Sequence, residues 1–349
     1  MLAAALALGA AACVSGFDRN DQTVNSLRIL GASMHVDNGD GIDWADAQAG
    51  DTVTFKALVA NPTGIPDVTV TWVTCVPPDL NNTLTPCTNE TTLRDPIQLI
   101  GMPGVLMLGQ AMPSADEATV QIQFTVPPEV KALTQQLIDR ADMHVNAQCA
   151  LYLPVPVIII AQGNGGTTVV TAVKNLRLSP WSQIGPTDPT DSSLQAYVRN
   201  FNPSISALNI PNDHSACVGQ TLVQSCKTDT DCTNGGPCSA DGWCPPVNPF
   251  PAGAETICGQ IPDTDTQTYY YCGMDGVDGS EMEYPSITWY ETAGSEADVA
   301  NTNTTGTPDL AARTFQLFTR PTGPFTLYGV VRDGRDGENW IAQTFPALP

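Results

Sequence analysis

The chain has 349 residues, more than a single hydrophobic core usually supports, so we expect two domains. Its 36 acidic and 14 basic residues give a formal net charge of -22 at pH 7. This charge repels the phosphate backbone of DNA and RNA, and it excludes nucleic acids as partners. Apolar residues make up 42% of the chain and charged residues 14%, which is enough to form cores and excludes disorder of the whole chain.

The chain opens with an apolar run, MLAAALALGAAAC, that ends at Cys13. The run is too short to span a bilayer, which takes about 20 apolar residues. Small residues directly before a cysteine resemble a bacterial lipoprotein signal. The resemblance implies that Cys13 carries a diacylglycerol anchor and becomes the mature N-terminus. The alternative is a signal peptide cleaved near Ala12 without lipid. Residues 14–24 are polar and aperiodic and are predicted to form a tether.

An acidic segment, DNGDGIDWAD, follows at residues 37–46. Hard oxygen ligands at this density suit calcium, the one cofactor that the sequence suggests. The candidate ligands are Asp37, Asn38, Asp40, Asp43 and Asp46. The EF-hand register fails, because taking Gly41 as the loop glycine puts Val36 at the first ligand position and Ala47 at the twelfth. The alternative is an Asx-rich turn between two strands.

The cysteine count predicts a disulfide framework. Removing Cys13 from the 11 cysteines leaves an even set, which is typical of a protein in an oxidising compartment. We expect all of these to pair: Cys75, Cys87, Cys149, Cys217, Cys226, Cys232, Cys238, Cys244, Cys258 and Cys272. Cys75 and Cys87 flank a short loop and are predicted to bond to each other. Cys149 is left with Cys217, Cys258 or Cys272, so that at least one bridge joins the two halves of the chain.

Period-two alternation and enrichment in Val, Thr, Ile and aromatic residues predict half-buried strands, with 29 Gly and 29 Pro supplying turns. Residues 151–161 are interpreted as a buried strand, and helical patterning is confined to 128–142. Three segments recur in the same order, which indicates a duplication. The pairs are 25–30 and 174–179, 51–62 and 192–203, and 68–74 and 285–291, the last pair containing Trp72 and Trp289.

We therefore predict an all-β protein of two tandem immunoglobulin-like β-sandwiches. The predicted domains are residues 25–165 and 166–349, with a linker at 162–168. The second domain is expected to carry a disulfide-rich insertion at about 204–283. Within it, Cys226, Cys232, Cys238 and Cys244 are separated by five residues each, in a polar segment that cannot fold by hydrophobic burial. Zinc sites favour closer pairs, so disulfides are expected instead.

Few residues suggest chemistry. The three histidines lie far apart, and no HExxH, GxSxG or phosphate-binding loop occurs. Carboxylate pairs are frequent in so acidic a chain and carry little weight as catalytic groups. Three consecutive tyrosines, Tyr269, Tyr270 and Tyr271, form a candidate platform for stacking on sugars. Residues 332–340 contain two Asp-Gly pairs and are interpreted as the turn between the last two strands.

Several stretches resemble known families. The tryptophans in VTWVTC and ITWYET resemble the core tryptophan of immunoglobulin-type domains, although no cysteine on the preceding strand matches true antibody domains. The segment VDNGDGIDWADAQAGDTVTFKALVANPTG resembles bacterial surface Ig-like modules. CKTDTDCTNGGPCSADGWC and FTLYGVVRDGRDGENW resemble predicted lipoproteins of myxobacteria and related bacteria. These resemblances imply a cell-envelope lipoprotein, but they do not indicate an activity.

The sequence thus predicts a non-enzymatic protein with an adhesion, scaffold or interaction role, held in a membrane through Cys13 and binding a protein or glycan. Val14 and Ser15, which follow Cys13, do not match the aspartate that retains lipoproteins at the inner membrane, so the outer membrane or cell surface is expected. Without lipid the protein would be periplasmic or secreted. The alternatives are a carbohydrate-binding module, or an envelope enzyme with an unrecognised carboxylate site.

Overall fold

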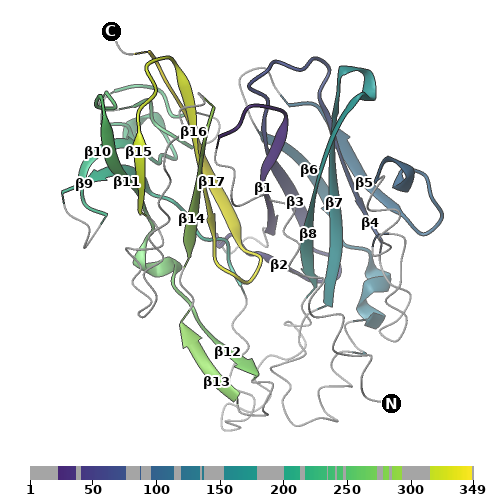
Figure 1. Cartoon of the computed structure of the whole chain (residues 1–349). Coiled ribbons are helices and arrows are strands. Elements are labelled where there is room, and N and C mark those ends of the chain that lie inside the picture. The colour runs from purple at the N-terminus through teal and green to yellow at the C-terminus, as the bar shows by residue number, and fades with distance from the viewer. Residues whose placement is uncertain are drawn as a thin grey trace.

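The computed structural model describes most of the chain between Thr23 and Ala347, and its regular structure is almost entirely β-strand (Figure 1). The predicted all-β class is confirmed. None of the helices in the described residues is long and apolar enough to cross a membrane. The described residues are 23–36, 41–75, 87, 96–113, 119–133, 136, 153–178, 200–212, 217–233, 235–239, 242–246, 249–272, 278–282, 285–292 and 315–347.

The first sandwich consists of a three-stranded and a five-stranded sheet. The smaller sheet has the order β1-β3-β6, all antiparallel: β1 (Arg28–Val36), β3 (Thr52–Ala60) and β6 (Thr119–Thr125). The larger has the order β2-β8-β7-β4-β5: β2 (Asp46–Ala47), β8 (Thr168–Leu178), β7 (Leu153–Gly163), β4 (Thr69–Thr74) and β5 (Leu106–Ala111). The predicted strand at 151–161 is therefore present as β7.

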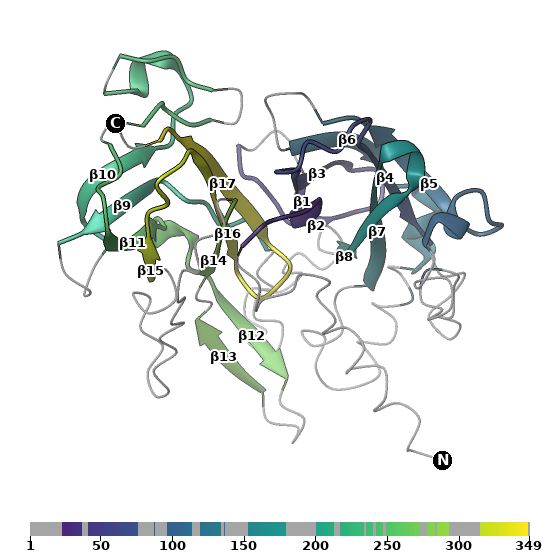
Figure 2. The same cartoon turned by 45° about the horizontal axis from the view of Figure 1, so that its top comes forward.

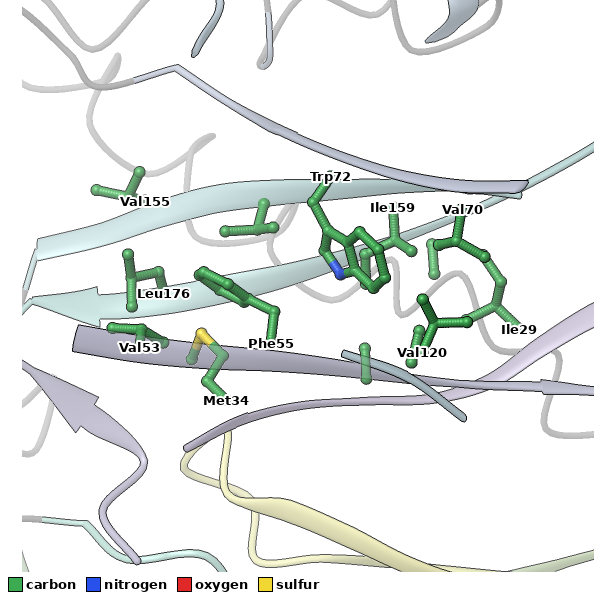
Figure 3. Packing of buried hydrophobic residues seen from close by; sticks show 14 of the residues in the cluster. Ile29, Met34, Val53, Phe55, Val70, Trp72, Val120, Val155, Ile159 and Leu176 are labelled. Carbon is green, nitrogen blue, oxygen red and sulfur yellow. The ribbon is translucent and has the colours of Figure 1, made fainter. Parts of the chain in front are cut away.

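The core of this sandwich lies between the two sheets, where Trp72 of β4 is fully buried beside Phe55 of β3 and Met34 of β1 (Figure 3). Alternation explains the arrangement of β3, because Val53, Phe55, Ala57 and Val59 point into the core at every second position. Burying one such aliphatic or Phe side chain contributes about 1.5–3 kcal/mol, so these strands account for much of the stability of the sandwich. The predicted core role of Trp72 is confirmed.

The second sandwich combines a three-stranded and a four-stranded sheet. Trp289 is buried in its core, as predicted, near a cluster in which Phe325 stacks on Phe345 and both meet Phe250 edge-on. The smaller sheet is β14 (Ser286–Glu291), β16 (Phe325–Arg332) and β17 (Glu338–Phe345). The larger has the order β10-β9-β11-β15: β10 (Gly219–Gln224), β9 (Ala207–Pro211), β11 (Ala254–Gln260) and β15 (Phe315–Thr319).

The predicted domain boundary is wrong. Residues 162–168 are not a linker but the tip of a hairpin in which β7 pairs with β8 along its whole length, around the short 3-10 turn η6 (Asn164–Gly166). Gly165 and Gly166 have positive φ angles there, a conformation that glycine adopts without strain. Turn residues look alike in a hairpin and in a linker, so composition alone could not separate the two. The first sandwich thus extends to Leu178.

Two further expectations change as a result. Residues 174–178 of the segment 174–179 end the last strand of the first sandwich, so this segment is not equivalent to 25–30, which lead into the first strand. The predicted insertion at 204–283 is also too broad, because β9, β10 and β11 inside it are sheet strands of the second sandwich. In the predicted helix 128–142, residues 131–133 and 136 are helical after the 3-10 turn η4 (Pro128–Val130). The remaining residues of that helix, like 192–199 of the repeat, lie outside the described part.

The two sandwiches pack through their three-stranded sheets, which face each other in the middle of the molecule (Figures 1 and 2). Leu30 of β1 and Leu58 of β3 turn away from their own core and meet Tyr290 of β14, Tyr328 of β16 and Trp340 of β17. Gly31 permits this contact, because a Cβ atom there would lie only 3.1 Å from both Glu338 and Trp340. The result is a four-layered body with a buried apolar interface between its two halves.

Candidate functional site

A buried ion pair joins the two sandwiches at one edge of this interface. The Nζ of Lys174 on β8 lies 2.9 Å from Oε2 of Glu338 on β17, and both side chains are buried. Arg332 donates to the other oxygen of Glu338 at 3.0 Å, and the backbone N–H of Ala32 reaches that same oxygen at 3.2 Å. Glu338 therefore has two cations and an amide as partners. We call this group the polar joint. It also includes the residues described next: Asp46, Arg177, Asn200, Asn202, Asp333 and Arg335.

Two asparagines connect the remaining polar groups of the joint. Asn202 donates to the carbonyl of Met34 at 2.7 Å, and its own side-chain oxygen accepts from the N–H of Glu338 at 3.1 Å. Asn200 donates through Nδ2 to Oδ2 of Asp333 at 2.8 Å and to the carbonyl of Arg335 at 3.0 Å. Since Met34 belongs to the first sandwich and Arg335 to the second, these amides bridge the two halves.

The first sandwich supplies a second buried ion pair at the joint. Arg177 on β8 lies 3.6 Å from Oδ1 of Asp46, and it donates to the carbonyl of Arg335 in the second sandwich at 2.6 Å. The other oxygen of Asp46 accepts from the N–H of Asn200 at 3.1 Å. Asp46 and Arg177 are also partners in the parallel pairing of β2 with β8. Each charge is thus held by groups of opposite charge or by amides.

The joint is completed by the turn between β16 and β17, which the sequence predicted as a turn. Asp333 Oδ1 accepts from the N–H groups of Arg335 and Gly337 at 2.7 and 2.9 Å, an Asx-type turn. A Cβ at Gly337 would lie 1.9 Å from Asp333 Oδ2, so any larger residue there would displace the Asp333 side chain from this turn. Burial raises the pKa of Asp333, while the hydrogen bond from Asn200 opposes that shift. This geometry fixes the relative position of the sandwiches.

The predicted calcium segment is only partly described, and its described members already have protein partners. Asp43 Oδ2 lies 2.6 Å from Nδ1 of His35, and Oδ1 accepts from Asn202 at 3.1 Å. Asp46 is buried in the joint. Asp37, Asn38 and Asp40 lie outside the described residues. The described members therefore do not gather as a set of open oxygen ligands.

The described residues of the cysteine-rich segment 226–244 form a small knob, closed by two interleaved disulfides, Cys226–Cys238 and Cys232–Cys244. The predicted disulfides are confirmed. Each bridge joins cysteines that are 12 residues apart in the sequence. A disulfide that closes a loop of this size contributes about 3 kcal/mol to the free energy of unfolding by restricting the unfolded chain. Among the described residues, the sulfurs of Cys226, Cys232 and Cys244 form the one cluster compact enough for a metal, but they are oxidised in these bridges.

Polar contacts and one aromatic residue hold the knob in place. Asp231 accepts from the N–H groups of Lys227 and Thr228 at 2.7 and 2.9 Å, and these bonds lower its pKa. Asp229 accepts from the N–H of Cys238 at 2.8 Å. Trp243 packs into the core of the second sandwich. The knob is thereby fixed to β10 and presents a polar outer surface.

The other disulfides agree with the sequence prediction where they are described. Cys75 bonds to Cys87, as predicted, and Cys217 bonds to Cys258. Cys149 lies outside the described residues, and nothing of the Cys272 side chain is described. The bonding of Cys217 to Cys258 removes two of the three predicted partners of Cys149.

The tyrosine cluster lies on β12 (Thr268–Cys272), which pairs with β13 (Asp278–Met282) in a separate two-stranded hairpin. This hairpin extends away from the sandwich sheets (Figures 1 and 2). The side chains of Tyr269, Tyr270 and Tyr271 lie outside the described part, so their use as a sugar platform stays a prediction.

No protein-family model matches the chain, and no curated protein matches it. Among solved structures, the fibronectin(III)-like modules of Clostridium thermocellum CbhA align with 90% of this chain and 93% of theirs, at 8% identity and a TM-score of 0.19. Dimeric latent PorU from Porphyromonas gingivalis aligns with 91% of this chain but 24% of its own length, at 12% identity and a TM-score of 0.20.

A third structure is the protein SGBP-B from the mixed-linkage glucan utilization locus of Bacteroides ovatus, in complex with a mixed-linkage heptasaccharide. It aligns over 93% of this chain and 71% of its own, at 11% identity and a TM-score of 0.19. TM-scores this low carry no conclusion about the function of this chain.

Sequence reasoning missed the polar joint. Lys174 and Arg177 occupy strand positions in an acidic chain, and Asn200 and Asn202 flank Phe201 just before Pro203. Charged residues in a strand that is otherwise apolar are a signal of buried pairing. Their partners, however, lie 158–164 residues away for Arg177–Arg335 and Lys174–Glu338. No local pattern identifies them.

Proposed function

We propose that the protein is a non-enzymatic binding or scaffold protein of the bacterial cell envelope, exported and anchored through a lipid on Cys13. In this proposal the four-layered body is a rigid support that presents the disulfide-closed knob to a protein or glycan ligand. Loops on a rigid scaffold are where binding surfaces commonly arise.

The observation that carries the proposal is the contrast between the joint and the knob. The ionisable groups of the joint are buried or half-buried and are engaged with one another, so they serve to fix the sandwiches. The knob instead exposes polar groups such as Lys227 and Thr230 on a framework that two disulfides prevent from unfolding. Rigidity of this kind lowers the entropy lost on binding.

A labelling experiment tests the anchor. The full chain is expressed in a Gram-negative bacterium fed an alkyne analogue of palmitate. We expect label on the wild-type chain and none on Cys13→Ser, with the wild type in the membrane fraction. Equal labelling of the two, or a wild-type chain without label, would contradict the lipid anchor.

A binding experiment tests the knob. Purified protein is titrated onto isolated cell envelopes, with Lys227→Glu combined with Thr230→Arg as the knob variant and Gln121→Arg on β6 as the surface control. We expect saturable binding that the knob variant weakens at least tenfold and the control leaves unchanged. Equal binding by all three would contradict the role of the knob, and catalytic turnover of envelope glycans, peptides or esters would contradict the non-enzymatic assignment.

The separate hairpin with its three tyrosines favours a glycan as a second candidate ligand, since stacked aromatic rings bind the apolar faces of sugars. A glycan array tests this. Binding lost in Tyr270→Ala and retained in the knob variant would support the hairpin as the glycan site, and the absence of any glycan signal would remove this candidate.

A further inference from the structure

The four cysteines of the knob bring their sulfur atoms together. The Sγ atoms of Cys226, Cys232 and Cys244 all lie within 4.8 Å of one another, and Cys238 joins them through its bond to Cys226. The first three are buried, and Cys238 is half-buried and packs against them. In the part of the chain that the structure describes, no other group of His, Cys, Asp and Glu side chains is this compact. The knob thus gathers four soft ligands in one place.

Backbone hydrogen bonds fix the positions of these cysteines independently of the bridges. The N–H of each knob cysteine donates to a group other than sulfur, and such bonds do not depend on the oxidation state of the sulfurs. Trp243 adds a further attachment, since it packs into the core of the second sandwich and forms a β-bridge with Ser225. The four bonds run from Cys226 to the carbonyl of Gly242 (2.7 Å), from Cys232 to the carbonyl of Asp229 (3.3 Å), from Cys238 to Oδ1 of Asp229 (2.8 Å) and from Cys244 to the carbonyl of Gln224 (3.0 Å).

The sulfur positions are close to those of a tetrahedral metal site. Zinc bound by four thiolates has zinc–sulfur distances of about 2.3 Å, which separates the sulfurs from one another by about 3.8 Å. The bonded sulfurs of the knob would have to separate and the others to approach, by about 1–2 Å, which side-chain rotations can supply. Zinc motifs favour cysteines that are close in sequence because neighbouring ligands chelate locally. In the knob, the fold brings the ligands together instead.

We propose that the knob has a second, metal-closed state, in which Cys226, Cys232, Cys238 and Cys244 bind one thiophilic cation of the zinc(II) class after both bridges are reduced. A dithiol supplies two electrons to each bridge and becomes a disulfide itself, which leaves four thiols in the knob. Zinc then displaces the four thiol protons, because thiols bind metals as thiolates. This state depends neither on the lipid anchor nor on the ligand that the knob presents.

Charge and burial favour a cation at this position. The net charge of -22 raises the concentration of cations around the protein, and the buried sulfurs limit the access of water to the metal. Exchange with a disulfide oxidant would reverse the reaction, since it restores the two bridges and releases the metal. The knob would therefore remain closed in both redox states, and the redox state would decide whether it holds a metal.

Cobalt(II), a spectroscopic substitute for zinc, tests the proposal in the purified full chain, reduced by a phosphine that does not compete for the metal. We expect the intense visible bands of a tetrahedral cobalt–thiolate site, at one cobalt per chain, and their loss when zinc is added. The oxidised protein should show no such bands, and neither should Cys232→Ser combined with Cys244→Ser. The matched control, Cys75→Ser combined with Cys87→Ser, removes a bridge of the same sequence separation, 12 residues, and should retain the bands.

Alkylation mapped by mass spectrometry locates the ligands in the wild type itself, without a variant that could fail to fold. Zinc should protect the four knob cysteines of the reduced protein and leave the reactivity of Cys75 and Cys87 unchanged, and circular dichroism should show that the zinc-bound form is folded. A reduced wild type that lacks the thiolate bands, or that zinc does not keep folded, would overturn the proposal. Bands that survive in the knob variant would assign the metal to other cysteines, and equal cobalt binding by the oxidised protein would assign it to carboxylates. Either result would also overturn it.

Discussion

Lys174 Nζ and Glu338 Oε2 lie 2.9 Å apart across the boundary between the two sandwiches, with both side chains buried. The pair connects the last strand of the first sandwich to the last strand of the second. Buried charges are costly unless they are paired, so a shift of one sandwich against the other that breaks the pair while both side chains stay buried is unfavourable. The relative position of the two sandwiches is therefore coupled to the stability of the whole chain.

Replacing Glu338 with Gln should destabilise the protein by about 3–5 kcal/mol, because it leaves the buried Lys174 and the half-buried Arg332 beside a neutral group. Urea unfolding followed by circular dichroism measures the loss. The matched control is Glu255→Gln on β11, a half-exposed carboxylate, which should change stability by less than about 0.5 kcal/mol. Equal effects of the two substitutions would show that the buried pair does not contribute as described.

The pKa of Asp333 is raised by burial, so its contribution to stability should depend on pH. The folded state holds this proton more tightly than the unfolded state, whose pKa is near 3.8. The contribution is therefore complete below pH 3.8 and is lost as pH rises through the folded pKa. Asn at this position cannot titrate. The free energy of unfolding of the wild type, minus that of Asp333→Asn, should be larger at pH 4 than at pH 8, and a difference that does not change with pH would contradict the assignment.

Tyr328 should control stability in alkali, because burial in the interface between the sandwiches raises its pKa from 10 to about 12. Burial also raises the pKa of Tyr290 beside it. Because the pKa of Tyr328 is higher in the folded state than in the unfolded state, its contribution to the free energy of unfolding is complete below pH 10. This contribution is lost as pH rises toward about 12. We expect the free energy of unfolding of Tyr328→Phe, measured by denaturant titration, to fall less steeply with pH over that range than that of the wild type. An unchanged alkaline slope would indicate that Tyr328 ionises freely in the folded protein.

Much of the fold could be predicted from local signals. Alternating strands placed Trp72 and Trp289 in two cores, and the even cysteine set predicted the bridges that are described. The connectivity of the knob could not be predicted, because four equally spaced cysteines permit three pairings. The boundary was misplaced since glycine and asparagine favour turns in hairpins and linkers alike. The polar joint and the edge position of β5 depend on contacts between distant strands, which a single sequence does not specify.

The remaining disulfide follows by elimination. Cys217 bonds to Cys258, so if all ten cysteines pair, Cys149 is left with Cys272. Non-reducing proteolysis and mass spectrometry should yield a linked peptide pair that contains these two residues, and no free thiol. Two alkylated cysteines at these positions would contradict the prediction, as would a link from Cys149 to any other cysteine.

The central claim is that the two sandwiches form one rigid body. Double electron–electron resonance between spin labels on non-natural amino acids at Gln121 on β6 and Gln220 on β10, both exposed, measures their relative position directly without disturbing the disulfides. Our account predicts one narrow distance distribution in the wild type that broadens in Glu338→Gln. A broad or multiple distribution in the wild type would mean that the sandwiches move independently, and would contradict the account.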